Sequence, residues 1–201
     1  MLNELFKTYP MLETCKKEIE EALNLIISTY KNGGKILVCG NGGSAADCEH
    51  IVGELMKGFM LKREVKDERI PESLTKNLQG SLPAISLVSQ VGVLSAFIND
   101  VDPDMMYAQL VYGYGKDVDL LICLSTSGNS VNCVKAAEIA KCIGVKVLSM
   151  TGAKESMLSK ISDCTIRVPE TETFKVQEYH LPVYHYLCAE VEKHFFGMDV
   201  K

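Results

Sequence analysis

The 201-residue chain lacks any apolar run of the length that a membrane-spanning helix requires. Such a helix needs about 20 predominantly apolar residues. The longest candidate, residues 118–124, is only as long as a strand and contains Asp119. The first residues also lack a basic segment followed by an apolar run and a cleavage site, so we expect no targeting segment. These absences predict a soluble protein that has no membrane partner.

The chain also lacks an excess of positive charge. It has 21 Lys and Arg residues against 26 Asp and Glu residues, a net charge of −5 at pH 7, which argues against nucleic acid or anionic lipid as a partner. Neither of the phosphate-loop patterns G-x-x-x-x-G-K-[ST] and G-x-G-x-x-G occurs. We therefore expect no nucleotide cofactor.

The eight cysteines include no C-x-x-C pair. Most of them fall at apolar-periodic positions, such as Cys39 and Cys123 within two apolar runs. Buried free thiols in a reducing compartment are the simplest interpretation, which predicts a cytoplasmic location.

What the chain does have is an alternation of apolar strands and amphipathic helices. We expect strands at residues 35–39, 82–88, 119–124, 145–150 and 165–168. We expect helices at residues 45–59, 131–143 and 175–196, with Pro182 bending the last one or delaying its regular start. A further amphipathic helix, residues 11–31, lies within an N-terminal segment of residues 1–33 that precedes the first strand. The alternation predicts an α/β fold, a three-layer doubly wound parallel sheet, and the length fits one domain over residues 1–201.

Residues 61–80 interrupt this alternation. The segment is strongly charged between residues 62 and 69, and residues 71–78 predict a short helix that Gly80 ends. Long loops with some structure of their own are often lids or subunit contacts. A solvated excursion is the alternative that the sequence leaves open.

Two polar loops follow two of the expected strands. The first is Gly40-Asn41-Gly42-Gly43-Ser44, where Ser44 is placed to cap a helix, and the second is Ser125-Thr126-Ser127-Gly128-Asn129-Ser130. Open α/β sheets bind ligands at the carboxyl ends of their strands, where helix N-termini and backbone N–H groups converge. Glycines let the backbone approach an anion, and hydroxyls supply neutral donors. A tight turn would also explain the first loop alone, but the two loops together predict a phosphate site.

Four further side chains are candidates for chemistry at this edge of the sheet. His50 and Glu54 are four residues apart on one helix and share a face. Gln177 and His185 are eight apart on the last helix, about 80° around its axis. A carboxylate base, an imidazole acid and an amide would be a plausible catalytic set, although each residue alone is as well explained as an ordinary polar side chain.

These motifs, in this order, resemble the phosphoheptose isomerase branch of the sugar isomerase (SIS) family. The resemblance includes both loops, His50-x-x-x-Glu54-Leu55, Asn99-Asp100, Thr151-Gly152 and Gln177-Glu178-x-His180 with His185, and it covers about residues 30–195. It implies a flavodoxin-like SIS fold and a homotetramer. It also implies the isomerisation of sedoheptulose 7-phosphate to D-glycero-D-manno-heptose 7-phosphate.

The resemblance further implies roles for single residues. Glu54 would be the catalytic base and His185 the acid. The substrate contacts would be Asn41, Gly42, Gly43, Ser44, Glu54, Asn99, Asp100, Ser125, Thr126, Ser127, Ser130 and Gln177. Some relatives hold zinc through residues that match His50, Glu54, Gln177 and His185.

The sequence departs from the family in two places. The family often has an arginine shortly after its Glu-Leu, where this chain offers Lys57, Lys62 or Arg63, and segment 61–80 is longer than in typical heptose isomerases. Two alternatives therefore stay open. One is an isomerase of another sugar phosphate, and the other is a non-catalytic SIS module that binds phosphosugars or regulates a partner.

Overall fold

A computed structural model describes residues 2–197 and contains one five-stranded parallel sheet. Its strands are β1 (Ile36–Gly40), β2 (Ala84–Ser86), β3 (Leu120–Leu124), β4 (Lys146–Thr151) and β5 (Cys164–Arg167). They are arranged in the order β2-β1-β3-β4-β5, which is the flavodoxin-like order of doubly wound folds. The predicted fold class and all five predicted strands are confirmed.

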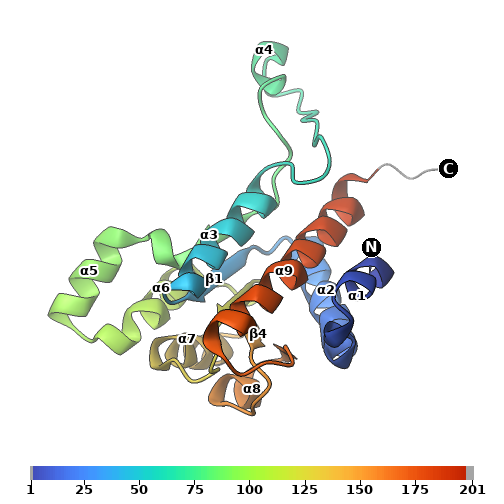
Figure 1. The fold of residues 1–201 in the computed structure, drawn as a ribbon. Helices are drawn as coiled ribbons and strands as arrows, with labels where there is room; N and C mark the ends of the chain where they lie inside the picture. The colour runs from blue at the N-terminus through green and yellow to red at the C-terminus, as the bar shows by residue number, and fades with distance from the viewer. Residues whose placement is uncertain (1, 198–201) are drawn as a thin grey trace.

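The central strands β1, β3 and β4 bury both of their faces, which explains why they read as nearly continuous apolar runs. Along β1, Ile36 and Val38 belong to one hydrophobic cluster, while Leu37 and Cys39 belong to another. The first cluster packs under α2 (Lys16–Lys31), α3 (Gly43–Met56) and α9 (Thr173–Phe196). Figure 1 shows α3 and α9 running side by side. The second packs under α6 (Met106–Tyr114), α7 (Val131–Cys142) and α8 (Met157–Ile161). The sheet is thus the middle of three layers.

Several helices differ from the prediction. Residues 11–31 are not one helix, because a 3₁₀ turn, η1 (Pro10–Cys15), precedes α2, and α1 (Leu2–Thr8) was not expected. The stretch between β2 and β3 forms η2 (Leu87–Ser89), α5 (Val91–Asp100), η3 (Pro103–Met105) and α6, none of which was predicted. Helix α9 continues through Pro182. None of the described helices, within residues 2–197, has the length and apolar character that crossing a membrane takes.

Residues 61–80 form an arm that projects from the rest of the molecule, with α4 (Glu72–Thr75) at its far end (Figure 1). The short helix is therefore confirmed, although it has only four residues and buries none of them. The two sides of the arm meet at its base, where Glu64 and Gln79 form a bridge and Gly80 N–H donates to the Arg63 carbonyl at 2.7 Å. A pocket of about 420 Å³ lies at this base, between residues 62–65 and 75–79.

Candidate active site

The two polar loops lie next to each other because their strands are neighbours in the sheet. Strand β1 pairs with β3 in parallel register, so that Gly40 at the end of one is opposite Leu124 at the end of the other. The chain passes from β1 to β2 on one side and continues with β3 on the other. Ligands of open α/β sheets bind in the crevice at such a reversal of strand order.

The first loop turns sharply into α3. Gly42 has a φ of +57°, a conformation that side chains other than glycine rarely adopt, and it caps the helix. The prediction that Ser44 is the N-cap is therefore wrong. Ser44 is a buried residue in the first turn of α3. A Cβ atom on Gly43 would lie 2.7 Å from Nε2 of Gln177, so this amide packs directly against the loop. Gln177 of α9 thus lies beside the first loop.

Asn41 links the first loop to the helix that follows the second. Its amide donates to Oδ1 of Asn132 and accepts from Nδ2 of Asn132, each at 2.9 Å. The buried Tyr107 donates to the Gly40 carbonyl at 2.6 Å. The two loops are therefore held in a fixed relative position.

The second loop is held by hydrogen bonds among its own residues. Ser125 Oγ and Ser130 Oγ are 3.0 Å apart, and Asn129 N–H donates to Ser127 Oγ at 3.1 Å. Gly152 N–H donates to the Thr126 carbonyl at 3.0 Å, which ties the loop to the end of β4. Helix α7 begins directly after Ser130. The positive end of a helix and the surrounding hydroxyls form a suitable environment for a phosphate group.

His50 connects the two helices that carry the proposed acid and base. Its Nε2 atom is 3.3 Å from Oε1 of Glu54 on the same helix and 3.3 Å from Nε2 of His185 on α9. The expected convergence of these three residues is thus present in the structure. Gln177, the fourth residue of the expected set, lies against Gly43 instead of contacting this trio among the described interactions.

Tyr184 and Asp47 fix the orientation of the His50 ring. The buried tyrosine donates its only O–H proton to Asp47 Oδ1 at 3.1 Å, and its oxygen is 3.0 Å from Nδ1 of His50. This oxygen therefore has to accept a hydrogen bond from the N–H group of Nδ1. In the neutral ring, Nε2 of His50 then carries a lone pair that faces Glu54 and His185.

The pKa of His185 is lowered, first by burial and then by the neighbouring His50, while Glu54 acts in the opposite direction. A histidine with a lowered pKa is neutral near pH 7. A neutral imidazole has one N–H donor and one acceptor. His185 can therefore pass a proton between two oxygen atoms of a ligand.

The basic residues after Glu54 take different positions. Lys57 Nζ is 3.3 Å from Oε2 of Glu54 and is exposed. Arg63 is fully buried and pairs with Glu192, so its guanidinium is turned away from the surface. Of the three candidates for the family arginine, Lys57 is the one beside the carboxylate.

The fold of one chain does not place Asn99 and Asp100 beside the other predicted site residues. They lie at the end of α5, where Asn99 donates to Asp100 at 2.7 Å, and both are exposed. Figure 1 shows α5 set apart from α9. Their predicted role as substrate contacts is not supported by the position of α5 in one chain.

A metal ion is a separate question. Among residues 2–197, no group of three or more His, Cys, Asp or Glu side chains has the arrangement of a metal site. The trio nevertheless has the donor types that zinc prefers, two imidazoles and a carboxylate. The tautomer set by Tyr184 also leaves two acceptors, Nε2 of His50 and Oε1 of Glu54, facing each other. Two acceptors that face each other repel. A proton on Nε2 of His50 or a cation bound between the two atoms would remove this repulsion.

Sequence reasoning did not find Asp47, Tyr184, Asn132 or Phe59, whose ring centroid is 5.5 Å from that of His185. A signal was available for two of them, since Asp47 is one helical turn before His50 and Tyr184 adjoins His185. Asn132 and Phe59 had none, because only the fold brings them to the site.

Comparisons with known proteins agree with this geometry. A family model described as SIS domain matches residues 7–152. A phosphoheptose isomerase of Helicobacter pylori is 38% identical over 184 residues, which cover 92% of this chain and 88% of the relative. A phosphoheptose isomerase of Rhodospirillum rubrum is 39% identical over 181 residues, covering 90% and 88%. The solved structure of a phosphoheptose isomerase from Neisseria gonorrhoeae superposes with a TM-score of 0.78 at 27% identity, covering 95% of this chain and 94% of that one.

Proposed function

Because the chain belongs to the SIS domain family, we propose that it is a sugar-phosphate isomerase that converts sedoheptulose 7-phosphate to D-glycero-D-manno-heptose 7-phosphate. The relatives named phosphoheptose isomerase support this substrate. The single observation that carries the proposal is the convergence of Glu54 and His185 on His50, beside two loops suited to a phosphate. We take residues 1–201 as one SIS domain.

The proposed reaction moves one proton between two carbon atoms and one between two oxygen atoms. Glu54 removes a proton from C1 of the ketose, which gives an enediol, and returns the proton to C2. Neutral His185 gives a proton to the oxygen on C2 and takes one from the oxygen on C1. No electron acceptor is consumed, so a nucleotide cofactor has no step to perform.

The rest of the site binds and orients the sugar phosphate. We assign the phosphate to the loop of residues 125–130 and the start of α7, where hydroxyls and the positive end of a helix are available. Asn41, the glycines after it and Gln177 would hold the hydroxyl groups between the phosphate and the reacting carbons. Lys57 is placed to balance the charge of the Glu54 carboxylate.

We also propose that zinc binds here through His50, Glu54 and His185, with Gln177 as a fourth ligand. When bound, it could polarise the substrate's carbonyl oxygen as a Lewis acid by taking that oxygen as a further ligand, because four protein ligands already complete a tetrahedral site. An amide oxygen is an unusual zinc ligand, and Gln177 lies against Gly43. The metal is therefore tested independently of the proton transfers.

A homotetramer in the cytoplasm is the proposed assembly and location. Helix α5 supports self-association, because it buries no residue in the described chain and exposes Val91, Val93 and Ile98. The apolar stripe of α2 is not available for an interface, because it packs in the chain's own core. A charged sugar phosphate does not cross membranes unaided, which fits an enzyme that works where such substrates are made.

The function is tested by incubating the purified protein with sedoheptulose 7-phosphate and with a panel of other ketose and aldose phosphates. Proton NMR in D₂O follows both the aldose product and the exchange of the C1 proton. We expect conversion of the seven-carbon ketose. Conversion of another member alone would favour the isomerase of a different sugar phosphate. Binding without exchange in any member would favour the non-catalytic module.

A further inference from the structure

The chain contains a fully buried ion pair that no step of the proposed reaction uses. Arg63 and Glu192 are 129 residues apart, and Nε of the arginine donates to Oε1 of the glutamate at 2.7 Å. Both side chains have no exposed surface. A buried pair of this kind contributes little net stability compared with apolar residues of similar size. The pair is therefore better explained by the segments that its two side chains hold in place.

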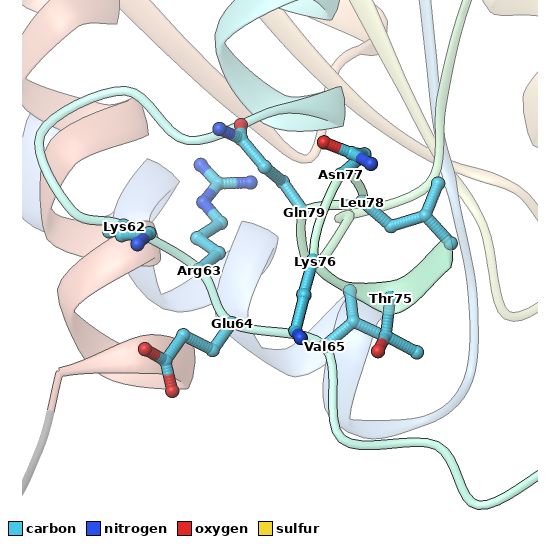
Figure 2. Close-up of a pocket in the computed structure, with 9 residues that line it drawn as sticks. All are labelled: Lys62, Arg63, Glu64, Val65, Thr75, Lys76, Asn77, Leu78 and Gln79. Carbon is cyan, nitrogen blue, oxygen red and sulfur yellow. The ribbon is translucent and has the colours of Figure 1, made fainter. Parts of the chain in front are cut away.

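Arg63 holds the end of the helix that carries the proposed base. Helix α3 ends at Met56, and the last carbonyl groups of a helix have no partner within it. Arg63 donates to the carbonyl oxygen of Glu54 at 2.8 Å and to that of Leu55 at 2.6 Å. Figure 2 shows its side chain directed inward beside Gln79, whereas Lys62 and Glu64 point elsewhere. The backbone of Glu54 is thus fixed by this guanidinium.

Glu192 holds the segment that follows α3. Its two carboxylate oxygens accept the backbone N–H groups of Phe59, Met60 and Leu61 at 2.7, 2.7 and 3.0 Å. Burial raises the pKa of Glu192, but these hydrogen bonds and Arg63 outweigh it, and the pKa is lower than usual. The carboxylate therefore stays charged and keeps all of its acceptors at neutral pH.

The pair also connects α3 to the helix that carries the proposed acid. Glu192 follows His185 by seven residues on α9, about two turns along the same face. The Phe59 ring, whose backbone Glu192 holds, packs against the His185 ring. Two residues that contact or form the site, Glu54 and Phe59, are thus tied to one point on α9.

We propose that Arg63 and Glu192 are positioning residues that set Glu54 on α3 against His185 on α9. This inference rests on the proposed isomerase function. Both side chains are fully buried and so are not available to a substrate. Losing the pair should displace Glu54 while leaving the phosphate loop at residues 125–130 unchanged. A misplacement of about 1 Å in a catalytic group can lower the rate by about 100-fold.

The test compares Glu192→Gln and Arg63→Lys with a control of matched burial, Asp119→Asn. Asp119 is also a buried carboxylate, pairs with Lys35 and accepts N–H groups of Lys35 and Lys116 at 2.8 Å each. It lies just before β3, at the amino end of this strand, whereas the site lies at the carboxyl ends of the strands. All variants are assayed at a temperature at which circular dichroism shows them folded.

We expect Glu192→Gln and Arg63→Lys to lower kcat by about 10-fold to 100-fold with KM changed by no more than about twofold. Asp119→Asn should keep its kcat even where its Tm falls as far. If kcat of the two variants falls no more than that of the control at equal Tm loss, the pair is only structural and the inference is overturned, with the proposed function intact. A wild-type protein that does not isomerise sedoheptulose 7-phosphate overturns the proposed function and this inference together.

Discussion

The Nε2 atoms of His50 on α3 and His185 on α9 lie 3.3 Å apart, although 135 residues separate them in the chain. Their rings meet edge to face, with centroids 4.8 Å apart. Two helices on the same side of the sheet, α3 and α9, are therefore in contact through these two side chains. The proposed proton transfers depend on this contact, and so do the predictions about the catalytic pair.

Changing Glu54 to Gln should abolish turnover while the protein still binds the sugar phosphate. The amide keeps the shape of the side chain but cannot take a proton from carbon. A positioned base contributes typically about 10²–10⁴-fold, so kcat should fall by about that factor. Steady-state kinetics and calorimetry on one preparation measure both quantities.

Glu21→Gln is the matched control for this change, because Glu21 is on α2 and pairs only with Lys17 at the surface among its described ion pairs. His185→Ala should resemble Glu54→Gln, with a larger loss of affinity if a metal is also lost. Near-native activity of folded Glu54→Gln would exclude the proposed mechanism and favour a binding module.

Removing hydroxyls from the second loop should weaken substrate binding more than it slows chemistry. Ser127→Ala and Ser130→Ala each remove one neutral hydrogen bond, worth about 1 kcal/mol. The double variant should therefore bind the sugar phosphate about 30-fold more weakly. Titration of inorganic phosphate against both proteins measures the same site without the sugar. Equal affinities would place the phosphate elsewhere.

His180 should make the fold sensitive to mild acid. It is fully buried beside the Thr151 carbonyl, and burial lowers its pKa from 6.5 to about 4. In the unfolded chain the ring takes up a proton near its usual pKa, so the stabilisation is complete above about pH 6.5 and is lost as the pH falls toward 4. The free energy of unfolding should decrease by about 3 kcal/mol over this range.

The variant His180→Gln isolates this effect, since glutamine keeps an N–H donor but does not titrate. Urea unfolding of both proteins at several pH values gives the free energy of unfolding of each as a function of pH. The contributions of the carboxylates cancel in the difference between the two curves. Identical pH dependence in the two proteins would mean that His180 is not the group that titrates.

The purified protein should contain about one zinc ion per chain if the trio at His50 is a metal site. Elemental analysis before and after treatment with a chelator measures it, and zinc should raise the Tm of the stripped protein. His50→Ala should remove both the metal and this shift in Tm. Absence of metal, with activity indifferent to chelator and to added zinc, would contradict the zinc site. A proton on Nε2 of His50 would then be what lies between this nitrogen and the Glu54 carboxylate.

Self-association should depend on α5. Ile98→Asp places a charge on the exposed apolar side of this helix, where Ile98 is 46% exposed. Light scattering should show a tetramer for the wild type and a smaller species for the variant. A stable wild-type monomer at micromolar concentration would contradict the proposed assembly.

Much of the fold followed from local patterns in the sequence. Strands β1 and β3 are buried on both faces, so their residues are apolar throughout, and each runs into a loop whose polar residues mark its end. Helix α5 could not be predicted in the same way. It buries no residue in the described chain. Its apolar residues are therefore not confined to the three- and four-residue spacing that a helix shows when one face packs on a core.

The site was predictable where its residues share one element and unpredictable where the fold joins two. His50 and Glu54 were found from the sequence because they are four residues apart on one predicted helix. The partnership of Arg63 with Glu192 has no local signal, because a charge run at residues 62–69 normally indicates a solvated loop. Only the structure shows that one of these charges turns inward to the end of α3.

The buried cysteines have a consequence for the handling of the protein. All eight lie within residues 2–197, and seven are buried, whereas Cys142 at the end of α7 is exposed. Burial raises the pKa of Cys15 to about 11 and those of Cys164 and Cys188 to about 12, and it is the thiolate that reacts with oxidants and alkylating reagents. These thiols are therefore less reactive toward such reagents than an exposed thiol. A maleimide dye should label Cys142 alone, which supplies one attachment point per chain for measuring distances between copies.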